Sequence, residues 1–156
     1  DKYLQEMAKA ADVLNKEHDV QIALLPLQYP ADVVTCKKVQ QFMEKEAVIL
    51  DAAFDTEQFL ALMGNFSLLI GMRLHALVFA AVMETPFIAL SYDPKIDGFV
   101  KEVAGTNLGA IENFVADDLV KAATTILKAE NISNERLNQL REKALENTQL
   151  AFKLLE

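Results

Sequence analysis

The feature that most constrains the fold is a repeated switch between short apolar runs and segments with helical apolar spacing. Such segments place apolar residues three or four positions apart, as Leu4, Ala8, Ala11 and Leu14 do near the start of the chain. The short runs have the length of strands and lie at residues 20–27, 47–50, 66–71, 86–91 and 108–111. Strands that alternate with helices and are apolar on both faces predict a parallel sheet covered by helices on both sides.

Helices are expected between and after these strands. The sequence "DTEQ" at residues 55–58 resembles a capping box, so a helix should begin there and run through Met63. The other expected helices cover residues 4–14, 31–44, 73–84, 96–103, 117–129 and 133–155. We therefore predict one three-layer, Rossmann-like α/β domain over residues 1–156, with a mainly parallel five-stranded sheet.

Composition limits the possible partners. The chain has 156 residues, of which 52% are hydrophobic and 24% charged, the balance of one globular domain with a sizeable core. Fifteen basic and twenty-three acidic residues give a net charge of −8, which is the wrong sign for binding nucleic acid. An anionic ligand must therefore be held by a few local groups.

Several other classes lack their sequence signals. Cys36 is the single cysteine, which excludes an internal disulfide and agrees with a cytoplasmic protein. No GxGxxG, Walker A or metal-spaced histidine motif occurs, so dinucleotide, P-loop and metal sites are not predicted. No apolar run reaches the length of a membrane span, and no signal peptide is visible. The chain begins on a helical pattern without a methionine, so we expect a domain of a longer protein.

Polar residues follow three of the predicted strands. In open parallel sheets, ligands bind at the carboxyl ends of strands, which selects residues 26–32, 71–75 and 91–95. Arg73 and His75 lie in the second of these loops. Two residues i and i+2 share a side only in an extended segment, so a joint role requires the helix to begin after Arg73. A guanidinium is a forked donor for carboxylate or phosphate, and a histidine exchanges protons near neutral pH.

Structural roles for the same residues remain open from the residues alone. Arg73 could instead pair with Asp93, and His75 could be a satisfied core histidine in the first turn of a buried helix. Gln28 and Asp32 could cap the helix that follows them. Tyr92 could pack or stack on a sugar.

A resemblance to a known family favours the functional interpretation. Residues 70–105, "IGMRLHALVFAAVMETPFIALSYDPKIDGFVKEVAG", resemble the signature of the polysaccharide pyruvyl transferase family, in particular its CsaB-like branch. Residues 24–32, "LLPLQYPAD", resemble the family's segment that follows a strand and carries Gln and Asp. The resemblance covers essentially this whole chain but only the C-terminal half of a two-domain, GT-B-like enzyme. The N-terminal domain would then be absent, and the isolated fragment is expected to be inactive.

The resemblance also implies a reaction and roles for particular residues. Family members transfer pyruvyl from phosphoenolpyruvate to two sugar hydroxyls, which forms a ketal and needs no cofactor or metal. Arg73, Leu74 and His75 match the donor-binding element, with His75 as general acid/base and Arg73 as the clamp for an anionic group. The remaining expected substrate-binding residues are Lys95, which would bind phosphate, Tyr92 and Asp93, which would shape the site or contact the acceptor, and Gln28 and Asp32.

The implied acceptor is a polysaccharide or a lipid-linked sugar. Relatives of the CsaB type modify cell-wall polymers that anchor surface-layer (S-layer) proteins, so the expected location is the cytoplasm, at the inner face of a bacterial membrane. Two other functions remain open from the sequence. One is a GT-B glycosyltransferase that uses a nucleotide sugar, and the other is a non-catalytic α/β module that docks through the apolar helix at residues 76–83.

Overall fold

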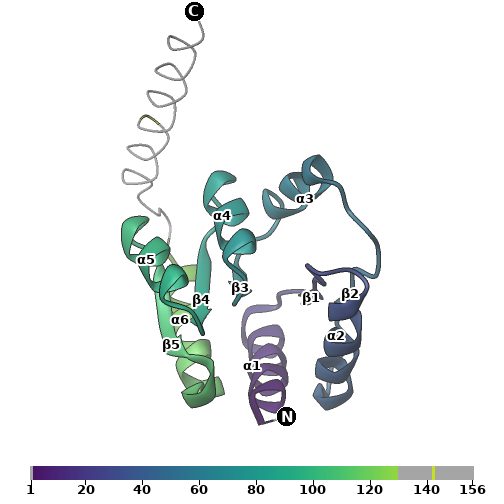
Figure 1. The fold of residues 1–156 in the computed structure, drawn as a ribbon. Coiled ribbons are helices and arrows are strands. Elements are labelled where there is room, and N and C mark those ends of the chain that lie inside the picture. The colour runs from purple at the N-terminus through teal and green to yellow at the C-terminus, as the bar shows by residue number, and fades with distance from the viewer. Residues whose placement is uncertain (1, 130–141, 143–156) are drawn as a thin grey trace, which may run out of the picture.

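The structure, a computed structural model, describes residues 2–129 and residue 142 (Figure 1). Within this range, helices alternate with strands along the chain. The elements are α1 (Lys2–His18), β1 (Ala23–Leu24), α2 (Ala31–Phe42), β2 (Val48–Ile49), α3 (Thr56–Met63), β3 (Leu69–Gly71), α4 (Leu74–Val82), β4 (Phe87–Ser91), α5 (Pro94–Glu102), β5 (Thr106–Ala110), a 3-10 turn (Ile111–Asn113) and α6 (Ala116–Leu127). The α/β class and the predicted element types are confirmed here. The helix predicted over residues 133–155 falls, apart from residue 142, outside the described residues.

The strands are all parallel to the neighbours they pair with, but they form two sheets. Strand β1 pairs with β2, and β3, β4 and β5 form a second sheet in that order. The prediction of one continuous five-stranded sheet was therefore wrong in detail, because no strand pairing links β1 to β3 in the part of the chain that the structure describes. Figure 1 shows β1 and β2 beside the three-stranded sheet, separated from β3.

Proline explains why β1 is short. Pro26 is fully buried and follows directly on Leu24 and Leu25. It has no backbone N–H to donate to a neighbouring strand, and so only Ala23 and Leu24 pair with β2. The predicted strand at residues 20–27 is cut to this pair, and the edge of β1 that would have met β3 remains outside a ladder.

Strand β4 is the centre of the larger sheet, and every one of its residues is buried. Phe87 and Ala89 belong to a cluster that contains side chains of α3, α4 and α5. Ile88 and Leu90 point to the other face and pack with side chains of α1 and α6. This alternation gives the three layers that the apolar pattern predicted, because successive strand residues face opposite sides.

Helix α4 packs inside the domain. Its residues Ala76, Leu77, Ala80 and Ala81 are all buried, and Leu77, Ala80 and Ala81 contact the cluster below β4. Most of the apolar surface that suggested a docking helix is thus covered by the domain's own core, while Val82 and Met83 at its end are exposed. The docking-module interpretation has no support from this helix.

Helix α1 joins the two sheets. Its residues Leu4 and Ala8 pack with Val39 of α2, and its C-terminal half packs with α6. At its last residue, His18 Nε2 lies 2.8 Å from Thr124 Oγ1 of α6. Among the described residues, no helix is long and apolar enough to cross a membrane, and no group of three or more histidine, cysteine, aspartate or glutamate side chains could hold a metal ion.

Candidate active site

The loops after β1, β3 and β4 lie where the sequence predicted. Strands β3 and β4 are parallel neighbours, so residues 71–75 and 91–95 open on the same edge of their sheet. The loop after β1 reaches this edge as well, because Gln28 and Asp32 contact Arg73. The three loops selected by the strand-end rule therefore meet at one edge, as expected, although β1 belongs to a separate sheet.

Arg73 stands just before a helix, so the condition for a joint role with His75 is met, although the helix was expected to include Arg73. It is the N-cap of α4 and has extended backbone angles, φ −92° and ψ 126°, while the helix begins at Leu74. Leu74 is partly buried and packs against the apolar cluster under the sheet. Leu74, the middle residue of the Arg-Leu-His triplet, thus fixes the turn by packing in the core. Its two polar neighbours, Arg73 and His75, are not needed for that packing. A Cβ placed on Gly71 would touch nothing closer than 3.8 Å, so the turn does not itself require glycine.

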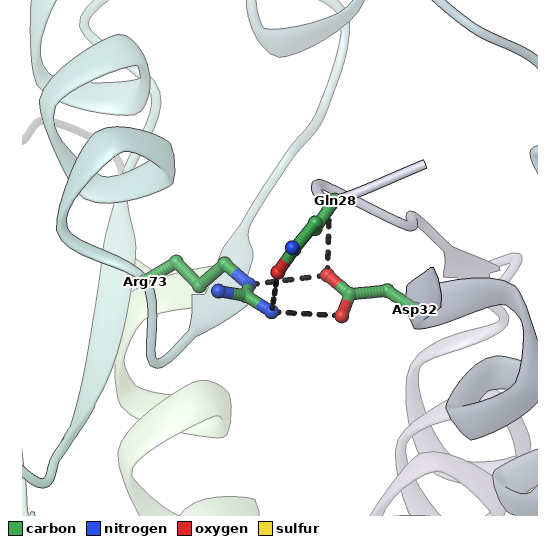
Figure 2. A network of polar contacts seen from close by, with 3 residues as sticks. All are labelled: Gln28, Asp32 and Arg73. Carbon is green, nitrogen blue, oxygen red and sulfur yellow. Dashed lines mark hydrogen bonds and ion pairs between the residues drawn. The ribbon is translucent and has the colours of Figure 1, made fainter. Parts of the chain in front are cut away.

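The guanidinium of Arg73 is held by Gln28, in the loop after β1, and by Asp32, in the first turn of α2 (Figure 2). Its Nε donates to Asp32 Oδ2 at 3.1 Å, and its Nη2 donates to Asp32 Oδ1 at 2.7 Å. The same Nη2 lies 3.4 Å from Gln28 Oε1. The two parallel bonds to one carboxylate are the bidentate geometry that only arginine can form. Arg73 therefore pairs with Asp32, and the suggested pairing with Asp93 is wrong.

The ion pair also sets the charge of both partners. Partial burial alone would raise the pKa of Asp32, but hydrogen bonds from Arg73 and from the Gln28 and Leu27 backbone, with the positive charge of Arg73, lower it below its usual value. The hydrogen bond to Asp32 raises the pKa of Arg73, against a smaller opposing effect of burial, and the negative charge of Asp32 raises it further. Both groups are thus fully ionised at neutral pH.

An open cavity of about 590 Å³ lies beside this pair. A cavity of this size is typical of small-molecule sites. Its lining combines polar groups with aromatic side chains from the loops after β1 and β2 and from α3 and α4. The lining residues are Pro26, Leu27, Gln28, Tyr29, Ala52, Ala53, Phe54, Asp55, Thr56, Phe59, Arg73, His75 and Phe79.

His75 lines this cavity and is exposed. It sits in the first turn of α4, two residues beyond Arg73. Within the described residues, no hydrogen bond or ion pair engages its ring. The core-histidine interpretation is therefore wrong, because a satisfied core histidine would be buried and bonded. The ring is available to a bound molecule.

The three predicted residues of the loop after β4, Tyr92, Asp93 and Lys95, are not among the residues that line the cavity. Asp93 is the N-cap of α5, where its carboxylate accepts the backbone N–H of Lys95 at 2.8 Å. This is the ordinary capping role of an aspartate before a proline at the helix start. Lys95 is exposed in the first turn of α5, and Tyr92 is 59% exposed on the loop before it.

Sequence reasoning missed the aromatic side of the cavity. Phe79 lies four residues after His75 on α4, which places both on one face of the helix. Phe54 belongs to the loop after β2, a fourth strand end that the rule for parallel sheets also selects. Helical spacing and the strand-end rule, applied to every strand, would have found both. Asp55, by contrast, was correctly placed in a capping box. Its carboxylate accepts the backbone N–H of Gln58 at 2.8 Å, and its own backbone N–H donates to Gln58 Oε1 at 3.0 Å.

The fold and this site define the class of protein: a Rossmann-like α/β domain with a polar site at the carboxyl ends of its parallel strands. The sequence model of the family named polysaccharide pyruvyl transferase matches residues 1–94, which include Gln28, Asp32, Arg73 and His75. With more than half of its residues matched, the chain belongs to the polysaccharide pyruvyl transferase family. Comparisons with curated proteins and with solved structures found no match.

Proposed function

We propose that this chain carries the donor site of an enzyme that transfers pyruvyl from phosphoenolpyruvate to hydroxyls of a polysaccharide. The observation that carries the proposal is the convergence of Arg73 and the unbonded ring of His75 on one cavity. Membership of the pyruvyl transferase family supports the reaction class. The donor is an anion with a carboxylate and a phosphate, and Arg73 is the cationic side chain among the residues that line this cavity.

The proposed chemistry uses His75 first as an acid. It gives a proton to the methylene carbon of phosphoenolpyruvate, which leaves positive character on the neighbouring carbon. One sugar hydroxyl attacks that carbon and loses its proton to His75. A second hydroxyl then forms the other bond of the ketal, and phosphate leaves with its oxygen and the second proton. Arg73 holds the donor's anionic groups throughout and stabilises the charge that moves onto phosphate.

Other parts of the chain have proposed supporting roles. Lys95 and Tyr92 follow β4 at this edge and would contact the phosphate or the acceptor, and Asp93, the N-cap of α5, lies between them in the sequence. We propose a cell-wall polysaccharide or a lipid-linked sugar, of the kind modified by CsaB-like enzymes, as acceptor. Residues 1–156 would form the C-terminal half of a GT-B-like enzyme in which a second domain closes the open side of the cavity.

Variants of the two central residues test the proposal in the complete enzyme. Arg73→Lys keeps the charge, but the ammonium would pair with Asp32 and lose the planar fork. Donor binding should then weaken by about 1–3 kcal/mol. His75→Asn should leave donor binding nearly intact and lower kcat by about 10²- to 10⁴-fold. Titration with phosphoenolpyruvate and acceptor-dependent phosphate release measure the two effects.

His18→Asn is the matched control, because His18 lies at the end of α1 and bonds to Thr124 of α6, away from the cavity. It should change neither kcat nor donor affinity. Normal turnover by the His75→Asn enzyme would overturn its role as acid. The 156-residue chain alone should bind the donor and release no phosphate, and turnover by this chain would contradict the two-domain proposal.

A further inference from the structure

Asp32 and Arg73 meet across the gap between the two sheets. Asp32 is the second residue of α2, which follows β1, and Arg73 immediately precedes α4, which follows β3. Since β1 and β3 are not paired in the described part of the chain, no backbone ladder fixes one loop against the other. Side chains must do so at this edge. Figure 2 shows the Arg73 side chain reaching from the start of α4 to the start of α2.

Asp32 is itself held firmly, unlike a free surface carboxylate. Its Oδ2 accepts the backbone N–H of Gln28 at 2.9 Å, and its own N–H donates to the Gln28 carbonyl at 2.9 Å. The carboxylate also lies in the first turn of α2, where the helix dipole favours a negative charge. Its side chain is 24% exposed, compared with 40% for Arg73. The better-fixed partner is therefore the aspartate.

The pair leaves one side of the guanidinium free. Asp32 takes Nε and Nη2, and Gln28 lies within reach of the same Nη2. In Figure 2 the remaining nitrogen, Nη1, lies on the side away from Asp32 and has no bond to either residue. Because the guanidinium is planar and rigid, fixing the Nε–Nη2 edge also fixes the direction in which Nη1 points.

We infer that Asp32 is a positioning residue: it orients the guanidinium of Arg73 so that the Nη1 side is presented to the anionic donor beside His75. This inference rests on the proposed function for the nature of the donor. It assigns Asp32 an indirect role, because the carboxylate contacts Arg73 and need not touch the substrate. A negative charge beside an anion site is otherwise unfavourable, since it opposes the binding of the anion.

Because the charge of Asp32 and its positioning of Arg73 would have opposite effects on activity, a substitution of Asp32 can distinguish them. If Asp32 acted only through its charge, Asp32→Asn would remove a repelling carboxylate and improve both donor binding and turnover. If Asp32 orients Arg73, the same change should lower kcat about 10- to 100-fold, because a small displacement of a positioning group is costly. The inhibition constant for inorganic phosphate should stay the same or fall. Asp32→Glu, which still offers two oxygens to Arg73, should recover part of kcat.

Asp51→Asn is the control in the complete enzyme. Asp51 makes an exposed ion pair with Lys37 at 3.5 Å and is not among the cavity's lining residues. This variant should leave kcat and phosphate inhibition unchanged. A loss of kcat in Asp32→Asn that merely matches a loss of folded protein, or an unchanged kcat, would overturn the positioning role.

A second readout does not depend on turnover. In complete enzyme labelled with ¹⁵N-arginine, with the signal assigned by Arg73→Lys, the Arg73 side chain should show slow rotation about Nε–Cζ. Asp32→Asn should make that rotation fast, and rapid rotation already present in the wild type would overturn the inference. If the wild type shows slow rotation but never releases phosphate from phosphoenolpyruvate with any acceptor, the proposed function fails while the orientation of Arg73 by Asp32 stands.

Discussion

At the scale of single residues, the Asp32–Arg73 pair links stability to pH. The pKa of Asp32 is lowered in the folded protein, so the ionised carboxylate is more stable there than in the unfolded chain. The stabilisation is fully present above the unfolded pKa of about 3.9 and is lost as pH falls through the lower folded pKa. Because both side chains are partly exposed, the stabilisation should be as small as that of a surface ion pair.

Asp32→Asn should therefore lower the free energy of unfolding at neutral pH by about 0.2–1 kcal/mol. The difference from the wild type should shrink as the solution is acidified and vanish once Asp32 is protonated. Urea unfolding of both proteins between neutral and strongly acidic pH measures it. A difference that persists unchanged in acid would show that the loss comes from the altered shape and hydrogen bonds of the asparagine.

The residues show what local sequence can and cannot predict. The existence of α4 was predictable from its apolar run, but its exact start was not, since the helix was expected from Arg73 and begins at Leu74. The cap formed by Asp93 was not predicted, although the proline after it is a local signal for a helix start. The partner of Arg73 was not predictable, because Asp32 is 41 positions away and meets it only through the packing of two loops.

At the scale of elements, the switch of apolar period predicted nearly every helix and strand in the described range. The lengths of the short strands could not be predicted. Pro26 was recognised as the end of a strand, but its effect on pairing depends on which neighbour β1 selects. The division of the sheet between β1 and β3 is therefore a tertiary result, bridged by α1 and by the Arg73 contacts.

Two glycines, Gly98 inside α5 and Gly105 between α5 and β5, test the packing around Phe87 of β4. A Cβ at Gly105 would lie 2.7 Å from Phe87 Cζ, and Phe87 is buried and stacked on Phe99. Gly105→Ala should destabilise the fold by about 1–3 kcal/mol, because the ring cannot move away without disturbing its neighbours. A Cβ at Gly98, inside α5, meets nothing within 4 Å. Gly98→Ala should stabilise by about 0.5–1 kcal/mol, as expected for glycine in a helix.

Thermal or urea unfolding of the two variants under identical conditions measures this contrast. The same chemical change is made at both positions, and the two effects are expected to have opposite signs. A Gly105→Ala variant as stable as the wild type would contradict the described close approach of Gly105 to Phe87.

At the scale of the whole molecule, family membership and site geometry point to the same edge of the domain. The family match covers residues 1–94, which include the loops after β1, β2 and β3, so all of the cavity's lining lies inside it. The chain has a net charge of −8, so its overall charge does not attract an anionic donor. Binding of the donor must therefore depend on local cations such as Arg73. Composition predicted this need for a local cation, and the structure supplies its partners.

The central claim is that Arg73 and His75 serve pyruvyl transfer from phosphoenolpyruvate. The most direct test measures, in one reaction of the complete enzyme, the phosphate released from phosphoenolpyruvate and the pyruvyl ketal formed on the polysaccharide. We expect one phosphate for each ketal, no phosphate without acceptor, and loss of both products together in His75→Asn. Phosphate released equally without acceptor, or sugar transferred from a nucleotide donor with no ketal formed, would contradict it.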